Sequence, residues 1–232
     1  MLNGKHFCKC IMDAPNNDHD VLKLSRPKAA VLNGAKWEEG AVITCRFLSG
    51  TPTLQKRVKA VAREWEKFAN VTLEFRDHGP TDIRIAFIAG NGSWSYLGTV
   101  CRQIPDPDPT MNYGWIDEDS DEAELRRVVL HEFGHALGLI HEHQNPENSI
   151  QWNKSAVIAD LKGPPNYWDD AAIENNMFRY YPKEAVTATA VDRNSIMMYP
   201  IPASWTLDGF SAGLNSELSP DDKALIGSVY PK

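Results

Sequence analysis

The chain has 232 residues, of which 42% are hydrophobic and 24% charged, and its formal net charge at pH 7 is −7. This composition is too apolar for a disordered chain, and the length is sufficient for a buried core without disulfide bonds. The acidic balance, with Lys and Arg scattered along the chain, argues against a nucleic-acid groove or an anionic membrane surface as the partner. No apolar run is long enough to span a bilayer.

The first part of the chain, residues 1–33, shows little periodicity and is rich in Asn, Asp, Lys and Pro. We therefore expect an irregular N-terminal arm, followed by one folded domain over 34–232. The first twelve residues, MLNGKHFCKCIM, lack the apolar segment of a signal peptide, so the protein is cytosolic, leaves by another route, or is numbered after a removed segment. The cysteines are either free or paired between the arm and the domain; they are Cys8, Cys10, Cys45 and Cys101.

The first half of the domain reads as a twisted sheet that carries helices. Apolar alternation and turn residues predict strands at 41–47, 71–75, 82–88, 92–99 and 111–117. After the first strand, Thr51 and Pro52 suit the start of a helix that continues to about residue 70. A strand, helix, strand order of this length favours parallel pairing with a right-handed crossover. The fourth strand, between glycines, is expected at an edge of the sheet.

A second long helix is predicted to begin near Asp119 or Asp121, where an acidic tract supplies a cap. The same tract, 117–124, is explained more simply by this cap than by a calcium site. The helix should end near Gly138, because glycine readily takes the left-handed conformation that follows a helix end.

The remainder of the domain is less regular. Residues 141–232 form a lower lobe in this interpretation, and the part up to about residue 140 forms an upper lobe. Short helices are indicated at 154–162 and 168–178, and Ser219 caps a final helix that anchors Leu225, Ile226 and Val229.

Four of the seven histidines fall in HEFGHALGLIHEHQNP, residues 131–146. His131 and His135 are four residues apart on the predicted helix, so their rings share one face, as two zinc ligands require. Gly138 lets the backbone turn so that His141 can supply a third ligand. Glu132 can then reach a metal-bound water without occupying a coordination position, and three protein ligands leave the fourth position open for that water.

A five-residue H-E-x-x-H match alone occurs by chance in unrelated helices. The full HEFGHALGLIH pattern adds a glycine and a third histidine at fixed offsets, and it lies on a helix predicted independently. These additions favour a zinc hydrolase site. His143 is expected to make a local hydrogen bond and not a fourth metal contact.

With these residues the chain resembles the metzincin metallopeptidases, whose H-E-x-x-H-x-x-G-x-x-H pattern is followed by a methionine-containing turn, the Met-turn. The candidate turn is NSIMMYP, residues 194–200. The resemblance places Met197 beneath the metal and gives Tyr199 the role of stabilising the transition state. Glu142, directly after the third histidine, resembles the astacin family, where this glutamate is tied to the processed N-terminus or to neighbouring structure.

Other segments are similar to matrixins and serralysins, namely HEFGHALGL and the closing LSPDDKALIGSVYP. The tract GSWSYLG resembles the upper-rim strand to which such enzymes add a substrate in antiparallel fashion. The resemblance covers about residues 35 to 231 and implies an α+β fold of two subdomains, with a mixed five-stranded sheet, two long helices and an irregular C-terminal lobe. It also implies one zinc ion, a peptide substrate, a monomer and an extracellular location. The stretch EHQNPEN departs from the animal astacins, so the preference for the residue after the cleaved bond is not transferred.

The arm carries a possible latency switch. Metzincin precursors are commonly blocked by an N-terminal cysteine or, in astacins, an aspartate that occupies the place of the water on zinc. Cys8 or Cys10 is the candidate thiol, and Asp13 is the alternative. A disulfide to the domain or an idle thiol is the competing explanation.

Three functional interpretations follow from the sequence. The first is an active zinc endopeptidase. The second is a latent or non-catalytic zinc-binding protein of the same fold. The third is a zinc hydrolase of a non-peptide amide. The intact Glu132 argues against the second, and the edge-strand tract favours an extended peptide over a compact amide.

Overall fold

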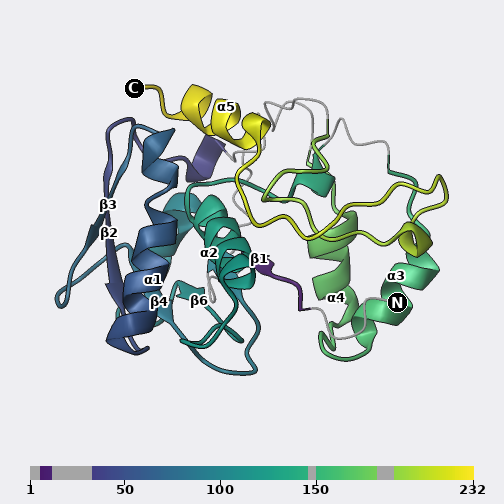
Figure 1. Cartoon of the computed structure of the whole chain (residues 1–232), viewed down its shortest axis with the longest axis horizontal. Helices are drawn as coiled ribbons and strands as arrows, with labels where there is room; N and C mark the ends of the chain where they lie inside the picture. The colour runs from purple at the N-terminus through teal and green to yellow at the C-terminus, as the bar shows by residue number, and fades with distance from the viewer. Residues whose placement is uncertain (1–5, 12–32, 146–149, 182–190) are drawn as a thin grey trace.

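A computed structural model of the chain describes residues 6–11, 33–145, 150–181 and 191–232. Two lobes lie side by side, and the first is built on one sheet (Figure 1). The six strands of this sheet are β1 Lys9–Ile11, β2 Val42–Phe47, β3 Thr72–Phe75, β4 Ile83–Ala86, β5 Trp94–Tyr96 and β6 Met111–Asn112. Their order is β1-β5-β6-β4-β2-β3, and every neighbouring pair is parallel except β5 and β6.

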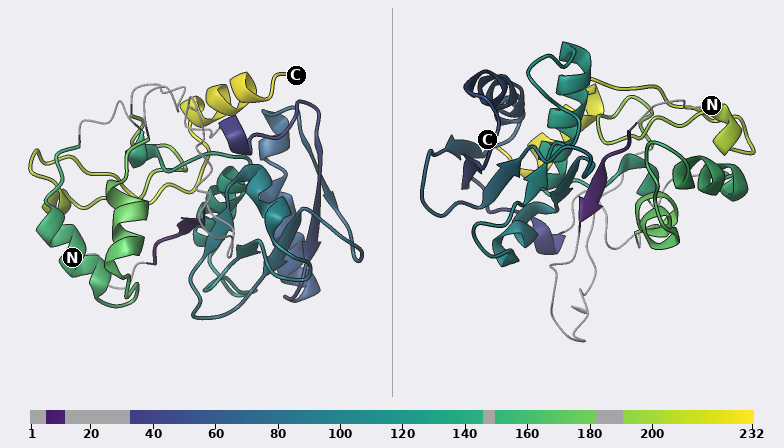
Figure 2. Two further views of the ribbon diagram at one scale, coloured as in Figure 1. Left: turned by 180° about the vertical axis from the view of Figure 1, so that it is seen from behind. Right: turned by 90° about the horizontal axis from the view of Figure 1, so that it is seen from below.

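All five predicted strands are present, and the sheet is mixed as expected. The sixth strand comes from the arm, which was expected to be irregular. Lys9 pairs with Trp94 and Ile11 with Tyr96, so β1 occupies the edge of β5 that would otherwise be open. Seen from below, β1 lies between the sheet and the second lobe (Figure 2).

The first long helix, α1 (Pro52–Ala62), begins as predicted and ends earlier. The Thr51 hydroxyl accepts a hydrogen bond from Leu54 N at 3.2 Å. After α1 the chain tightens into a 3-10 turn that contains Trp65. The Trp65 side chain is fully buried and donates its indole N–H to the Leu130 carbonyl at 3.1 Å. This tertiary contact explains why the predicted helix does not continue to residue 70.

The second long helix, α2 (Glu122–Ala136), has both predicted ends. The Asp121 carboxylate caps its N-terminus by accepting from the backbone of the first turn. At its C-terminus Gly138 has φ 94°, Gly138 N donates to His135 O at 2.8 Å, and Leu139 N donates to Gly134 O at 2.9 Å. This pair of bonds is a Schellman motif, which reverses the chain direction directly after the helix.

Residues far apart in the sequence complete the end of α2. The Trp37 indole N–H donates to Ala136 O at 2.7 Å, and the Tyr230 hydroxyl donates to Leu137 O at 2.8 Å. Both aromatic side chains are buried. They satisfy carbonyls that the helix itself leaves without partners.

The second lobe is less regular, as predicted. Its helices are α3 Lys154–Lys162 and α4 Asp170–Ile173, and α4 continues into a π-helical turn, η5 Glu174–Phe178. The last helix, α5 (Pro220–Val229), begins with a Ser219–Asp222 capping box. The 3-10 helices are η1 Asn33–Ala35, η2 Trp65–Lys67, η3 Gly98–Gln103, η4 Glu142–Gln144 and η7 Ala203–Trp205. Within the described residues, no helix combines the length and apolar character that crossing a bilayer needs.

Candidate active site

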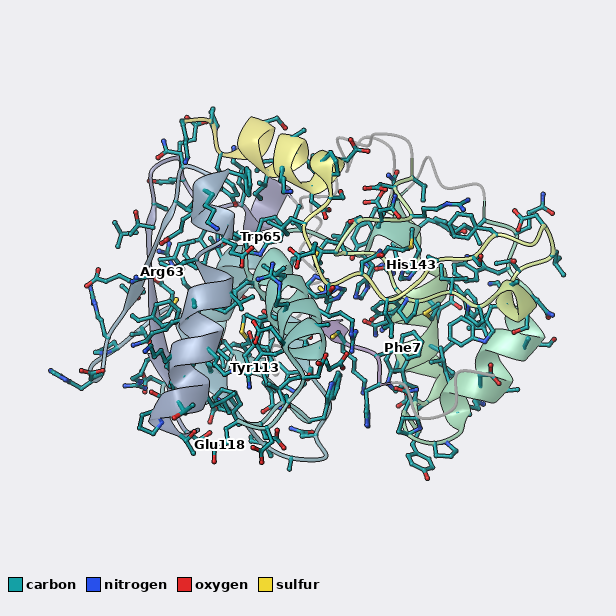
Figure 3. The ribbon with its side chains drawn as sticks, viewed as in Figure 1. Phe7, Arg63, Trp65, Tyr113, Glu118 and His143 are labelled. Carbon is teal, nitrogen blue, oxygen red and sulfur yellow. The ribbon has the colours of Figure 1, made fainter. Side chains whose placement is uncertain are left out.

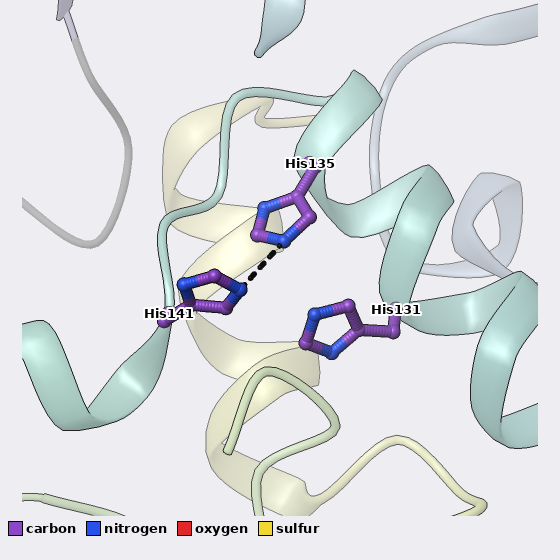
Figure 4. A group of neighbouring side chains, drawn as sticks. All are labelled: His131, His135 and His141. Atoms are coloured by element: carbon purple, nitrogen blue, oxygen red, sulfur yellow. Dashed lines mark hydrogen bonds between the residues drawn. The ribbon is translucent and has the colours of Figure 1, made fainter. Parts of the chain in front are cut away.

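The side chains of the three predicted ligands point toward one another (Figure 4). His131 and His135 project from α2, and the turn at Gly138 brings His141 opposite them. Their ligand atoms all lie within 4.8 Å of one another, and all three side chains are buried. Across the described residues, this is the one cluster of three or more side chains that could hold a metal ion.

Hydrogen bonds fix which nitrogen of each ring faces the centre. Each Nδ1 faces an oxygen that accepts a hydrogen bond from it. The oxygen is Ile196 O for His131 at 2.8 Å, Leu139 O for His135 at 2.7 Å and Gln144 Oε1 for His141 at 3.1 Å. Because an oxygen of this kind only accepts, each Nδ1 carries the hydrogen and each Nε2 presents a lone pair. Burial lowers the pKa of all three rings, which keeps them neutral. This is the protonation state that metal coordination requires.

The spacing of two lone pairs also fits a metal. His135 Nε2 and His141 Nε2 lie 3.1 Å apart, although neither carries a hydrogen to share. Two tetrahedral ligands with Zn–N bonds of about 2.0–2.1 Å are about 3.3 Å apart. His131 Nε2 is buried and makes no hydrogen bond within the described part of the chain. The donor set therefore fits a zinc ion.

Glu132 lies beside the histidines and is fully buried. Neither of its carboxylate oxygens makes a hydrogen bond of regular geometry with a described residue. Burial raises its pKa well above the ordinary value, whereas the facing Cys8 thiol, a weak donor, and the Arg127 guanidinium oppose that shift. An unpartnered carboxyl of raised pKa is suited to carrying a proton.

The turn predicted to contain Met197 passes directly under α2. A Cβ added to Gly134 would overlap Met197 Sδ and lie 3.2 Å from Met197 Cε, so the two residues are in close contact. The backbone of this turn is tied to two ligands, because Ile196 O accepts from His131 and Met197 O accepts from Glu142 N at 3.0 Å, next to His141. Met197 therefore packs against the helix that carries His131 and His135.

Asp222, from α5, anchors the same turn and was not identified from the sequence. Its carboxylate accepts from Ser195 Oγ at 2.6 Å, from Ile196 N at 2.8 Å and from Ser219 N at 2.9 Å. Burial raises its pKa, and these hydrogen bonds oppose the shift. Only its capping role was readable, since the Ser219 cap implies a partner three residues later.

Tyr199 packs its ring 4.2 Å from the His141 ring and 5.9 Å from the His131 ring, measured between centroids. Its hydroxyl donates to the backbone carbonyl of Cys8. The group expected to stabilise a transition state is thus bound to the arm.

The arm fills the space in front of the histidines. Cys8 is 2% exposed, and its thiol faces Glu132. Phe7 stacks on Trp205 at 5.5 Å and packs edge-on to Tyr199 at 5.2 Å, in the second lobe near His143 (Figure 3). The space that remains beside Cys8 and His131 is about 10 Å³, about the size that one water molecule needs. The arm residues Phe7 and Cys8 thus occupy the space in front of His131.

The two arm cysteines differ in position. Cys8 lies against Glu132, although it is not among the side chains whose ligand atoms converge. Cys10 is only partly buried and pairs through its backbone with Ser95 in β5. None of Cys8, Cys10, Cys45 and Cys101 forms a disulfide, which corrects the paired alternative. Asp13 lies outside the described residues.

One more residue near the site, Arg127, was also missed. Arg127, one helical turn before His131, is 8% exposed and binds Glu124 through two hydrogen bonds, of 2.8 and 2.6 Å. Its helical spacing from His131 is the signal that could have found it. Glu142 accepts from Asp192 N at 3.1 Å, and burial raises its pKa to about 7.

Comparisons with known proteins agree with this geometry. The model of the Astacin family (peptidase family M12A) matches residues 30–206. A solved structure of myroilysin is 46% identical with a TM-score of 0.84, and the match covers 87% of this chain and 98% of that one. A hatching enzyme from Oryzias latipes (medaka fish), described as a zinc-protease, has a TM-score of 0.58 at 16% identity over 85% of this chain and 94% of its own, a likeness of fold alone.

Among curated sequences, zinc metalloproteinase nas-30 of Caenorhabditis elegans is 28% identical over 141 residues, which is 60% of this chain and 17% of that protein. Stromelysin-1 of Mus musculus is 30% identical over 123 residues, which is 46% of this chain and 25% of that protein. The chain thus spans only a minor part of the curated relatives that it matches.

Proposed function

Because the chain belongs to the astacin family of zinc metallopeptidases (peptidase family M12A), we propose that it hydrolyses internal bonds of extended polypeptides. His131, His135 and His141 would hold one zinc ion. The observation that carries the proposal is the orientation of the three rings, since each Nδ1 is engaged by an oxygen and the ligand atoms converge within 4.8 Å. In this proposal the catalytic domain covers 34–232, with an upper lobe to about residue 140 and a lower lobe over 141–232, and the zinc ion would be held between them.

The side chains divide the reaction between them. A bound zinc ion supplies Lewis acidity, which polarises a carbonyl and acidifies a water molecule. Glu132 accepts a proton from the attacking water and delivers it to the leaving amine, because it is the unpartnered carboxyl beside the ligands. Tyr199 donates its hydroxyl hydrogen to the developing oxyanion once the Cys8 carbonyl no longer receives it. Met197 supports the ligands from below.

The arm, residues 1–33, would act as a pro-segment that keeps the enzyme latent, with Cys8 as the switch residue. Three contacts support this role: the Cys8 thiol faces Glu132, the Cys8 carbonyl accepts the hydrogen bond of the Tyr199 hydroxyl, and Phe7 packs beside Tyr199. A thiol is also a residue type that competes well with water for zinc. Burial and the Glu132 carboxylate raise the pKa of the Cys8 thiol, and a zinc ion would reverse that preference. The position of Cys10 makes it the weaker candidate.

Further properties belong to the same proposal. An extended peptide is the expected substrate because β5 presents a strand edge when β1 has left it. We place the active protein outside the cell as a monomer, on the family resemblance. Secretion is tested by locating the protein in the medium and in fractions of its producing cells. The oligomeric state is tested by light scattering coupled to a size-exclusion column.

The decisive experiment measures zinc content and cleavage of denatured casein. The parent is the Cys8→Ser chain, which is compared with the same chain carrying Glu132→Ala and with a control on the same helix, Glu122→Ala. Glu122 lies in the exposed first turn, so its loss should leave activity unchanged. We expect one zinc ion in all three and about 10²–10⁴-fold slower cleavage for Glu132→Ala, in line with loss of a general base. Zinc without cleavage in the parent would instead favour a latent or non-catalytic zinc protein, which removal of residues 1–33 would distinguish, and absence of zinc would overturn the proposal.

The switch is tested on the uncleaved chain. Cys8→Ser should raise cleavage activity above that of the wild type, and Cys10→Ser should leave the chain latent. If both variants stay as latent as the wild type, or if Cys10→Ser activates and Cys8→Ser does not, the role given to Cys8 is wrong.

A further inference from the structure

The arm is bound from both sides of the cleft by successive backbone groups. Lys9 N donates to Ser93 O, just before β5, at 2.9 Å. The next amide, Cys10 N, points to the opposite side and donates to Asn176 Oδ1 in the lower lobe at 3.2 Å. An extended chain presents its N–H groups alternately on its two edges, so β5 holds one edge and Asn176 holds the other.

Asn176 is fixed in the orientation that this contact needs. Its side chain is 6% exposed, and its Nδ2 donates to Ala172 O at 2.9 Å. With the amide hydrogens turned toward α4, the oxygen Oδ1 faces the arm. Asn176 lies in η5, a π-helical turn, a conformation that is found frequently at functional sites.

The same turn is connected to the zinc site. His143 Nε2 donates to the Asn176 carbonyl at 2.7 Å, and the His143 ring stacks on His141 at 5.3 Å between centroids. Gln144, which accepts from His141, donates from Nε2 to Arg179 O at 3.0 Å, directly after η5. The turn that binds the arm is therefore held against the third ligand at its middle residue, Asn176, and directly after its C-terminal end.

We propose that Asn176 is the lower-rim residue that binds the backbone of a peptide substrate. Its Oδ1 accepts one substrate amide hydrogen after the arm has left. This inference rests on the proposed peptidase function and deepens it. An amide oxygen contacts the backbone alone, so it serves a chain of either direction and any side-chain sequence: the arm parallel to β5, and a substrate antiparallel to it.

The contact to the arm is tested without any enzymatic activity, by amide hydrogen exchange of Cys10 in the full chain. Asn176→Leu keeps a similar volume and removes the acceptor, and Asn175→Leu is the matched control because the Asn175 side chain is exposed. We expect the Cys10 amide to exchange about fivefold to tenfold faster in Asn176→Leu only, which is the loss of one hydrogen bond. Asn176→Asp keeps an oxygen acceptor and should preserve slow exchange. Equal exchange in the wild type and Asn176→Leu would overturn the assignment, and Asn176→Ser replaces Asn176→Leu if the latter does not fold.

The contact to substrate is tested by peptide cleavage in the Cys8→Ser background. Asn176→Leu should raise KM about fivefold to tenfold and leave kcat within about twofold, because the lost bond contributes to binding of the ground state and the transition state alike. Asn175→Leu should change neither. Faster Cys10 exchange with an unchanged KM would overturn the substrate role. If the parent cleaves nothing, the proposed function fails, while the exchange result still decides the binding of the arm.

Discussion

Gly134→Ala is a direct test of the contact between α2 and the turn that contains Met197. The added methyl group would overlap Met197 Sδ and lie 3.2 Å from Met197 Cε and 3.4 Å from Trp65 Cζ2. Carbon and sulfur atoms pack at about 3.5–4.0 Å, so the methionine side chain has to move. Met197 is 2% exposed, so its side chain has to shift within the core and not into solvent.

Two opposing effects set the magnitude. Alanine is a better helix former than glycine by about 1 kcal/mol, which stabilises α2. Overpacking of a filled core costs about 1–3 kcal/mol. The net expectation is a loss of about 0–2 kcal/mol in the free energy of unfolding. Zinc affinity should fall more visibly, by about 10–100-fold, because the turn accepts hydrogen bonds from His131 and from the backbone beside His141.

The assays are urea unfolding and zinc competition against a chelator of known affinity. Gly227→Ala is the matched control, since Gly227 is also helical and its added methyl would meet only Phe68 O, at 3.2 Å. Met197→Ala should relieve the overlap, so the double variant with Gly134→Ala should lose less stability than the sum of the two single variants. This prediction would be refuted if Gly134→Ala had the same zinc affinity and stability as Gly227→Ala and if the two effects in the double variant were additive.

Two further predictions concern carboxylates. Burial raises the pKa of Asp82, but hydrogen bonds from Thr44 and Arg102 outweigh this effect and hold the pKa below its ordinary value. The pKa of Asp82 is thus lower in the folded than in the unfolded chain. The stabilisation is therefore present above the unfolded pKa of about 3.9 and is lost as the pH falls through the folded pKa. Urea midpoints at pH 3 and pH 6 should differ less in Asp82→Asn than in the wild type. Asp222→Ala should cost about 1–3 kcal/mol in urea unfolding, because the buried Ile196 N–H loses its acceptor, whereas the exposed Asp221→Ala should cost almost nothing.

The convergence of the three histidines was predictable because the information for it is local. His131 and His135 share a helix face by spacing alone, and a single Gly138 with positive φ accounts for the place of His141. The strands at 41–47 and 71–75 were predictable for the same reason, since alternation and a helix between them determine their parallel pairing.

The rest depends on contacts between distant segments. Lys9–Ile11 becomes a strand because β5 offers an unpaired edge, and no pattern within three residues could indicate it. The predicted helix after Thr51 stops early because Trp65 finds an acceptor on α2. Asn176 is one of many asparagines in the sequence, and only the folded chain shows that its oxygen meets the arm.

The hydrogen bond that closes the end of α2 also sets a time at which the site can form. Leu137 O receives its partner from Tyr230, 93 residues later. A ribosome that adds about 5–20 residues per second needs about 5–20 s to make that interval. During this time the last turn of α2, which carries His135, has a carbonyl without its native partner. The end of the helix that carries His135 therefore gains its native hydrogen bond only after residues 138–229 have been made, so this part of the candidate site matures late in synthesis.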